Sequence, residues 1–512
     1  MGLEGVGQAI HEREFLAPAG APLIVAVSAL FWCKRVMSHA TLNSSLSTGS
    51  ADSPPHAFDW PRADEAETFL RERLQLFLEH NAFARSLARR MHDETGTDFF
   101  EWVDHLVLRS DEEPALRAVG FGREPTADVT GTDAAYEHPR ATLPRVLVRP
   151  GERPGPSLVA LRPEFVGDFI ARHNLGNEPE GEPFSRYRRL VVSDDGGFRL
   201  EAVERRAYRG FVPAPLAAGQ TRAIVKAREL WQTRPRRFAD DREGMRTAHQ
   251  TLARILELVN RDVACHLFFE VERAYWESRN RAAGIQKQRQ DQLGLGWGNH
   301  DHHTFRCSRE HFVDLVDFML ELGFVKRERF YAGAEAGWGA QVLEHTPTGI
   351  VVFADVDLLP EETRFDFSTA RLPPAPRLGT VGLWVGLHGE SLLEAGMHHL
   401  EARFEFNSLR RQLQDRGINT MEPFSNFDFL RQAFTEGERW PVRHERAERL
   451  LAAGLITSEQ FNRFLKEGAL GSHLENLQRH GGFKGFNQKS VSAVIAATDP
   501  RREHFAGIPV QA

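Results

Sequence analysis

The chain has 512 residues, of which 41% are hydrophobic and 26% charged, and its net charge is −7 at pH 7. This composition is typical of a soluble globular protein with room for two or three domains, and the negative charge argues against a nucleic-acid partner. The three cysteines, Cys33, Cys265 and Cys307, are too few and too scattered for a disulfide framework or a CxxC zinc site. A reducing cytoplasm is therefore the expected location.

The N-terminal segment contains the one stretch that resembles a membrane or export signal. Residues 15–32 are uncharged, but they are barely long enough to span a bilayer and they contain two prolines. Glu4, Glu12 and Glu14 dilute the positive charge that a signal peptide carries at its start. We therefore expect residues 1–56 to be a disordered or upstream leader, with Met37 as the natural initiator and no attachment to a membrane.

Residues 57–290 show mixed patterns that are largely helical. A helix is predicted from Asp64, because Asp64 and Glu67 resemble a capping box and apolar residues then recur with helical spacing. Short β-like runs accompany another predicted helix between residues 143 and 215, and a long helical region follows. The charged segment 277–296, which ends in glycines, is the predicted boundary with a catalytic domain at 291–512. We expect the N-terminal region to pack on that domain and to supply walls or a lid for its pocket.

Two similar units follow residue 290, and each combines a histidine-bearing strand with an amphipathic helix. The first runs from HHTFRCS through REHFVDLVDFMLELGF to the strand patterns AQVLEHT and GIVVFADVDL. The second opens with the strand patterns TVGLWVGLHG and GMHHLEARFEF and continues into the helix NSLRRQLQDRGI. The repetition predicts an α+β fold that contains a duplicated βαβββ module.

The stretch NHDHHTFR, residues 299–306, raises the question of a metal site. Side chains alternate along a strand, so His302, Thr304 and Arg306 share one face while His303 and Phe305 share the other. The first face is polar and is expected to be solvated, whereas the second becomes apolar and is expected to face the core. This parity favours His302 over His303 as a metal ligand.

The same rule places His399 of GMHHLEARFEF on a polar face and His398 at the start of a core face. A third ligand is available at Glu475 in GSHLENLQR. Two histidines and one carboxylate on one face of a metal leave adjacent positions open, as in non-haem Fe(II) enzymes that activate O₂. The alternative is that these are hydrogen-bonded barrel histidines and a surface glutamate. The rival ligands are Glu344, His345 and His388.

Residues 302 to roughly 500 resemble the 2-oxoadipate dioxygenase/decarboxylase family, a divergent branch of the vicinal-oxygen-chelate superfold with chemistry similar to that of hydroxymandelate synthase. Five short motifs carry the resemblance in the family's order: the H-x3-R strand that starts at His302, HHLEAR, FLRQ, GSHLENLQR and VSAVIAA. The chain departs from the family in its long N-terminal region, in lacking a helical insertion before the VSA motif, and in having HH where the family has NH.

The resemblance implies an open barrel of the vicinal-oxygen-chelate type and assigns roles to individual residues. It places the metal ligands at His302, His399 and Glu475, with Fe(II) as the cofactor. The implied substrate-binding residues, of which the first two are also the implied catalytic residues, are Arg306, Gln432, Val491 and Ser492. Arg306 is expected to hold a carboxylate of the substrate through its planar guanidinium.

The function implied by the resemblance is that of an Fe(II)-dependent dioxygenase/decarboxylase of the lysine-catabolism type, which converts 2-oxoadipate to 2-hydroxyglutarate and releases CO₂. The expected partners are the 2-oxo acid and O₂, without nucleic acid or membrane. Two alternatives remain open. One is a glyoxalase- or isomerase-like metalloenzyme of the same superfold that binds Zn²⁺ or Ni²⁺ with Glu344 as a fourth ligand. The other is a non-catalytic protein that binds a small acid.

Overall fold

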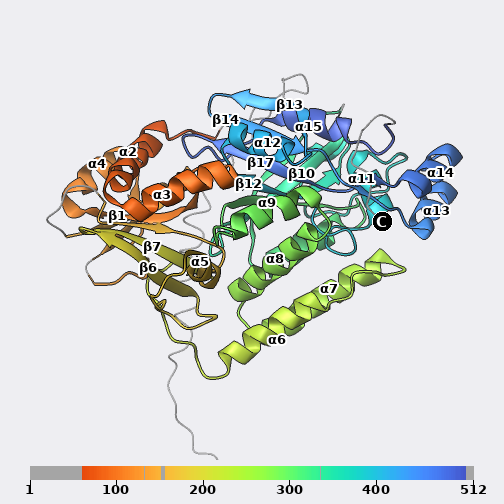
Figure 1. Ribbon diagram of the computed structural model, residues 1–512. Coiled ribbons are helices and arrows are strands. Elements are labelled where there is room, and N and C mark those ends of the chain that lie inside the picture. Colours follow the sequence, from red (N-terminus) through yellow and green to blue (C-terminus); the bar gives the residue numbers. More distant parts are fainter. Residues whose placement is uncertain (1–59, 132, 151–155, 335, 503–512) are drawn as a thin grey trace, which may run out of the picture. The chain divides into compact units, whose positions relative to one another are not determined.

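The computed structural model describes residues 60–131, 133–150, 156–334 and 336–502 (Figure 1). The leader expected at residues 1–56, including Met37, lies outside these residues. None of the helices in the described ranges has the length and apolar character needed to cross a membrane.

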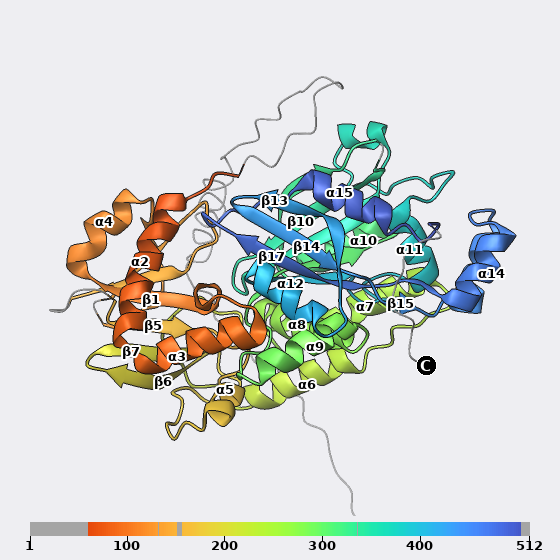
Figure 2. The ribbon, with the colours of Figure 1, turned by 45° about the horizontal axis from the view of Figure 1, so that its top comes forward.

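Two large mixed sheets and a set of helices make up the described chain (Figures 1 and 2). The helices are α2 (Asp64–His80), α3 (Ala82–Arg90), α4 (Glu113–Ala118), α5 (Val166–His173), α6 (Gln220–Gln232), α7 (Asp241–Leu256), α8 (Arg261–Glu277), α9 (Arg281–Asp291), α10 (Phe312–Glu321), α11 (Thr380–His388), α12 (Phe406–Gln414), α13 (His444–Ala452), α14 (Ser458–Glu467) and α15 (Gln488–Ala497). The strands are β1 (Val103–Arg109), β2 (Gly122–Arg123), β3 (Ala134–Glu137), β4 (Arg145–Arg149), β5 (Leu158–Leu161), β6 (Tyr187–Asp195), β7 (Phe198–Arg205), β8 (His300–Arg306), β9 (Val325–Tyr331), β10 (Trp338–His345), β11 (Ile350–Asp357), β12 (His399–Arg403), β13 (Thr420–Phe427), β14 (Leu430–Thr435), β15 (Arg439–Trp440), β16 (Ala469–Leu470) and β17 (His473–Arg479).

The C-terminal sheet has eight strands in the order β13-β14-β17-β12-β8-β11-β10-β9. In its first module, β8-α10-β9-β10-β11, strand β8 pairs parallel with β11, and β9, β10 and β11 pair antiparallel. The second module, β12-α12-β13-β14-β17, repeats this pattern, because β12 pairs parallel with β17 and β13, β14 and β17 pair antiparallel. Strands β8 and β12 pair antiparallel and join the modules. The predicted fold class, α+β with a duplicated βαβββ module, is confirmed.

The segment TVGLWVGLHG, predicted as a strand that opens the second module, instead forms helix α11. Nearly all of its residues are buried, so the sequence lacks the alternation that separates a strand from a buried helix. The second module therefore begins at β12.

The N-terminal sheet repeats the same architecture with seven strands in the order β2-β3-β4-β1-β5-β7-β6. Strand β1 pairs parallel with β4 and β5 pairs parallel with β7, while β1 and β5 pair antiparallel at the centre. The second half, β5-α5-β6-β7, is one strand shorter than the first. This duplication was not predicted from the sequence, because strands of two to five residues such as β2, β3 and β5 are too short to show a period.

Helices α8 and α10 cover the apolar face of the eight-stranded sheet. Phe268 and Phe269 of α8 and Phe318 of α10 belong to the same core cluster as Phe305 of β8. Helix α15 lies across the sheet beside β13 (Figure 2). The polar face of β8 therefore looks away from this core, as the alternation along the strand predicts.

Helix α9 occupies the charged segment in which the domain boundary was predicted. The side-chain amide of Gln286 donates to the carbonyl oxygen of Thr95 at 2.9 Å, and Nε of Arg289 donates to that of Glu94 at 2.9 Å. Both side chains are buried. The low apolar content of this segment thus reflects polar side chains that satisfy backbone carbonyls elsewhere in the fold.

Glu67 does not form the capping box predicted from the sequence. Helix α2 begins without a side-chain cap at Ala63. Oε2 of Glu67 instead accepts the backbone N–H of Gly481 at 2.5 Å, and Nε of Arg71 donates to Oε1 at 2.6 Å. Burial alone would raise the pKa of Glu67, but hydrogen bonding to His480 and the charge of Arg71 lower it to about 2. Glu67 therefore ties α2 to the turn that follows β17.

We predict that Glu67→Gln lowers the free energy of unfolding by about 1.5–3 kcal/mol at pH 7, because a charged acceptor of buried N–H groups is lost. Since folding lowers the pKa of Glu67 from 4.5 to about 2, its contribution is present above pH 4.5 and disappears as the pH falls towards 2. Denaturant unfolding at several pH values between 2 and 7 measures both effects. The matched control is Glu65→Gln, an exposed neighbour on the same helix turn. An equal loss of unfolding free energy in the two variants would contradict the stabilising role assigned to Glu67.

Candidate metal centre

Neighbouring strands of the eight-stranded sheet gather polar side chains on one face. His399 of β12 pairs with Thr304 of β8 on one side and with His473 of β17 on the other. Two positions further along, Glu401 pairs with Glu475. Because alternate residues of a strand share a face, this register brings donor groups from three strands into one pocket.

The three predicted metal ligands, His302, His399 and Glu475, lie together in this pocket. Oε2 of Glu475 lies 3.0 Å from Nε2 of His399 and 3.5 Å from Nε2 of His302. None of the three residues is more than 9% exposed. Their ligand atoms all lie within 4.8 Å of one another.

The spacing of these atoms fits a divalent metal ion. Two nitrogen or oxygen ligands that are each about 2.1 Å from a metal, at right angles, lie about 3.0 Å apart. Glu475 and His399 have this separation, and His302 is only slightly further away. A metal held by this group would keep adjacent coordination positions open on its other side.

The candidate ligands contact a second group of polar residues, which comprises Glu401, Gln432 and Arg479. Nδ1 of His302 lies 3.0 Å from Oε1 of Glu401, an arrangement in which a carboxylate orients a metal-binding imidazole. The amide of Gln432 donates to Oε2 of Glu401 at 3.1 Å and also to Glu475. Arg479 lies 3.0 Å from Glu401. Gln432, predicted as a substrate contact, thus hydrogen-bonds the candidate ligand Glu475.

Without a metal, the two histidines differ in charge. Burial alone would lower the pKa of His302, but the charge of Glu401, with Asp301 and Glu475, raises it to about 10. Burial, together with the positive charge of His302, lowers the pKa of His399 well below its usual value. His302 thus carries a proton that a metal must displace, because only a neutral imidazole binds one.

His302 and His303 point to opposite faces of β8, as the alternation predicts, but the face of His302 is not exposed to solvent. His303 points to the opposite side, where its ring packs on Phe269 at a centroid distance of 4.9 Å. The polar face is not solvated, since His302 is 6% exposed and Arg306 only 2%. Asp301 breaks the alternation and lies 3.7 Å from Nδ1 of His302, at a point where the register of β8 with β12 shifts.

Arg306 supplies an unpaired guanidinium to the same pocket. Among the described residues, no carboxylate lies within 4.0 Å of it, and its Nε has no hydrogen-bond partner. Its guanidinium lies 5.4 Å from the centre of the Trp384 ring. Burial lowers the pKa of Arg306 to about 10, and burial raises the pKa of nearby Asp355 to about 7. A buried cation without a partner is costly unless a ligand brings an anion to it.

Helix α15 contributes to the pocket wall. Val491 lines the pocket, but Ser492, predicted with it, is not among the lining residues. Both lie within α15 and not in a loop. The rest of the wall includes the apolar residues Trp338, Phe353, Phe434, Phe486, Val494 and Ile495 and the polar residues Thr304, Asp355, His398 and His473.

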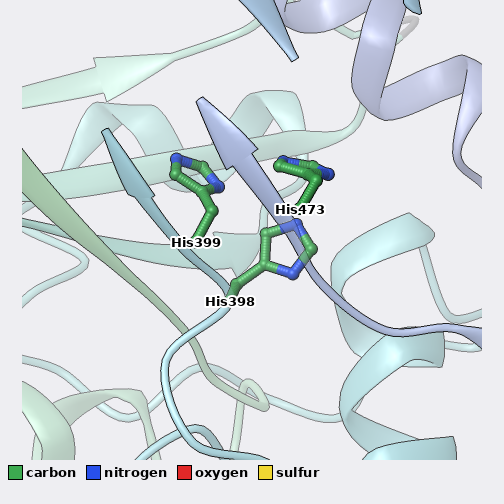
Figure 3. Close-up of side chains that lie close together, drawn as sticks. All are labelled: His398, His399 and His473. Atoms are coloured by element: carbon green, nitrogen blue, oxygen red, sulfur yellow. The ribbon is translucent and has the colours of Figure 1, made fainter. Parts of the chain in front are cut away.

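His398, His399 and His473 form a second group of possible ligands, which shares His399 with the first (Figure 3). Their ring centres are 4.8 to 5.3 Å apart. Neither ring nitrogen of His398 has a hydrogen-bond partner, and neither does Nε2 of His473. His398 was predicted on a core face, but it precedes the first residue of β12, so strand alternation does not apply and it lines the pocket.

The rival ligands proposed from the sequence belong to none of the ligand groups found among the described residues. Glu344 lines a separate cavity. Nδ1 of His345 forms a hydrogen bond of 2.8 Å with the Thr348 hydroxyl, and Nε2 of His388 forms one of 2.9 Å with the carbonyl of Leu470. The four-ligand site that a Zn²⁺ or Ni²⁺ enzyme would build with Glu344 is therefore not formed.

The sequence did not identify His473 as part of the pocket wall or Glu401 as the buried partner of His302. The signal was available, because Glu401 stands two residues after His399 and His473 two residues before Glu475, each on the same strand face. A glutamate is seldom buried without a partner, so the expected core position of both residues that flank Glu401 already called for one.

No protein-family model and no curated protein matches the sequence. Several solved structures are similar. A mutant of 4-hydroxymandelate synthase from Streptomyces coelicolor is 15% identical, with 79% of this chain and 99% of that chain covered and a TM-score of 0.27. Methylmalonyl-CoA epimerase from Mycobacterium tuberculosis is 12% identical, with 36% and 88% covered and a TM-score of 0.20. Similarity this distant carries no argument about function, and the fold assignment rests on strand order and register.

Glu475→Gln and His473→Gln distinguish the two candidate ligand groups, because each of these residues belongs to only one of the two. We predict that Glu475→Gln, like His302→Ala and His399→Ala, lowers metal affinity by more than about 100-fold, because a site with only three protein ligands cannot absorb the loss of one. His473→Gln should keep the metal. Elemental analysis after anaerobic reconstitution with Fe(II) measures the occupancy.

His303→Ala is the matched control for strand parity, since His303 is a buried neighbour on the opposite face. It should retain the metal. If His473→Gln loses the metal and Glu475→Gln keeps it, the three-histidine group is the true site.

Proposed function

We propose that the chain is an Fe(II)-dependent dioxygenase and decarboxylase that acts on a 2-oxo acid. The observation that carries the proposal is the presence, in one buried pocket, of a two-histidine, one-carboxylate group and the unpaired guanidinium of Arg306. Fe(II) bound by His302, His399 and Glu475 would supply open positions at which an oxo acid and O₂ can meet.

Arg306 is proposed to bind a carboxylate of the substrate. It stands four residues after His302 on the same face of β8, which separates the two by at most about 13 Å along the strand. A carboxylate in this position would end the isolation of a buried cation and form two parallel charge-assisted hydrogen bonds. Asp355 is nearby, but no carboxylate of the described residues lies within 4.0 Å of Arg306, which leaves its guanidinium available to a carboxylate of the substrate.

His398 and His473 are proposed to contact the substrate as well. Their unpaired ring nitrogens line the same pocket, and burial lowers the pKa of both well below the usual value, so each ring is neutral and offers one N–H donor. The apolar wall that includes Trp338 and Phe353 would exclude water around the reacting carbons. Such a pocket favours a substrate with a short carbon chain between polar ends.

The proposed substrate is 2-oxoadipate, with 2-hydroxyglutarate and CO₂ as products. In this reaction C1 leaves as CO₂, C2 becomes a carboxyl carbon and C3 gains a hydroxyl group. O₂ supplies one oxygen atom to C2 and one to C3, so the reaction balances without another reductant. Fe(II) and the oxo acid are the only further requirements.

The test is oxygen consumption by the purified chain with Fe(II) and a panel of 2-oxo acids of different length and terminal charge. We predict that O₂ uptake and CO₂ release are equal and that ¹⁸O₂ adds two labelled atoms to the product. Glu475→Gln serves as the inactive control. Substrate-dependent turnover with Zn²⁺ in the absence of O₂ would contradict the proposal and favour an isomerase.

Arg306→Lys tests whether Arg306 contributes to substrate binding or to iron binding. We predict that it keeps iron but raises KM by about tenfold or more, because an ammonium cannot reproduce a planar two-point contact. Arg306→Ala should have a larger effect. Iron and 2-oxoadipate titrations on each variant measure the two properties separately.

Arg329→Lys on the exposed face of β9 is the control and should leave both titrations unchanged. Loss of iron from Arg306→Lys would mean that the arginine supports the ligands, and unchanged kinetics would mean that it does not touch the substrate.

A further inference from the structure

We infer that a second cavity, distinct from the metal pocket, binds a small molecule that carries oxyanions. This cavity, called here the basic chamber, has a volume of about 400 Å³ and is lined by residues of both sheets. His302 and Phe353 line the chamber as well as the metal pocket. The inference does not rest on the proposed function, because the basic side chains without a carboxylate partner that carry it, Arg162 and Lys484, lie outside the candidate metal centre.

The charge of the chamber points to an anion. Eight basic and five acidic side chains line it. Six of the basic side chains have a carboxylate within 4.0 Å, as in the pair of Arg205 with Asp104 at 2.6 Å. Arg162 and Lys484 have none among the described residues. The chamber therefore retains positive charge that the protein itself does not neutralise.

Arg162 is held in a fixed position. It follows β5, where its backbone N–H donates to the carbonyl of Trp102 at 2.8 Å. Gly298 packs so closely against the carbonyl of Arg162 that a Cβ at this position would collide with it. Among the residues that the structure describes, the guanidinium makes one long hydrogen bond, of 3.5 Å, to the carbonyl of Thr348. A rigid backbone with a free guanidinium is the arrangement of a preformed binding group.

The electrostatic surroundings of Arg162 agree with this geometry. Burial lowers its pKa to about 10; the negative charge of Asp104 opposes this effect, and the positive charges of Arg205, Arg403 and Arg273 add to it. The pKa of Arg145, also in the chamber wall, is lowered to about 10 by burial and by Arg205. A bound anion would relieve this repulsion between like charges.

The size of the chamber selects a small metabolite over a single ion. A volume of about 400 Å³ is within the range of about 300–1,000 Å³ found for small-molecule sites. Arginines recognise carboxylates and phosphates through the same two-point contact. The common chemistry is thus a compact molecule with two or more carboxylate or phosphate groups.

The test is calorimetric titration of the metal-free full chain, at low ionic strength, with two probes. Inorganic pyrophosphate represents the phosphate class and tricarballylate the polycarboxylate class. We expect one probe to bind, and its affinity to fall about tenfold or more in Arg162→Gln and to a smaller extent in Lys484→Gln. The matched control is Arg410→Gln, an arginine outside the chamber that also lacks a carboxylate partner.

The probe that binds identifies the ligand class. Binding that survives in His399→Ala separates the chamber from the metal centre. The inference is overturned if neither probe binds, or if Arg162→Gln and Lys484→Gln both bind as tightly as the unaltered chain.

Discussion

The antiparallel pairing of β8 with β12 is the constraint on which the candidate site depends. It joins two βαβββ modules at their first strands, so that a histidine from each module reaches the same face. The parallel pairing of β12 with β17 then adds Glu475 next to Glu401. A shift of one residue in either pairing would turn these side chains to the opposite face. The strand register therefore brings the candidate ligands together.

The candidate metal centre buries several carboxylates close together, so their negative charge must be balanced by nearby positive charge. Asp301, Glu401 and Glu475 lie close together at low exposure, and Arg479 and the proton on His302 offset part of their charge. A divalent metal that displaces this proton replaces one positive charge by two. Burial and the charge of Glu475 raise the pKa of Glu401 to about 8, which is the strain expected of a carboxylate cluster without its cation. This incompletely balanced negative charge favours the binding of a cation.

The duplicated module and the meeting of His302 and His399 were predictable because the sequence alternates through β8 and from His399 to beyond the end of β12, whereas Glu475 was expected from the order of the family motifs. Burial was not predictable, since a polar face looks the same whether water or a closed pocket adjoins it, as His302 and Arg306 illustrate. Helix α11 was missed because it is apolar all round. The N-terminal sheet and the basic chamber depend on contacts between residues far apart in sequence, such as Arg162 and Gly298, which local patterns do not contain.

The most direct test of the metal site is an anomalous difference map from crystals grown anaerobically with Fe(II), recorded at the iron absorption edge. We expect one strong peak about 2.1 Å from Nε2 of His302, Nε2 of His399 and a carboxylate oxygen of Glu475. A peak among His398, His399 and His473, or no peak at full metal supplementation, would contradict this expectation.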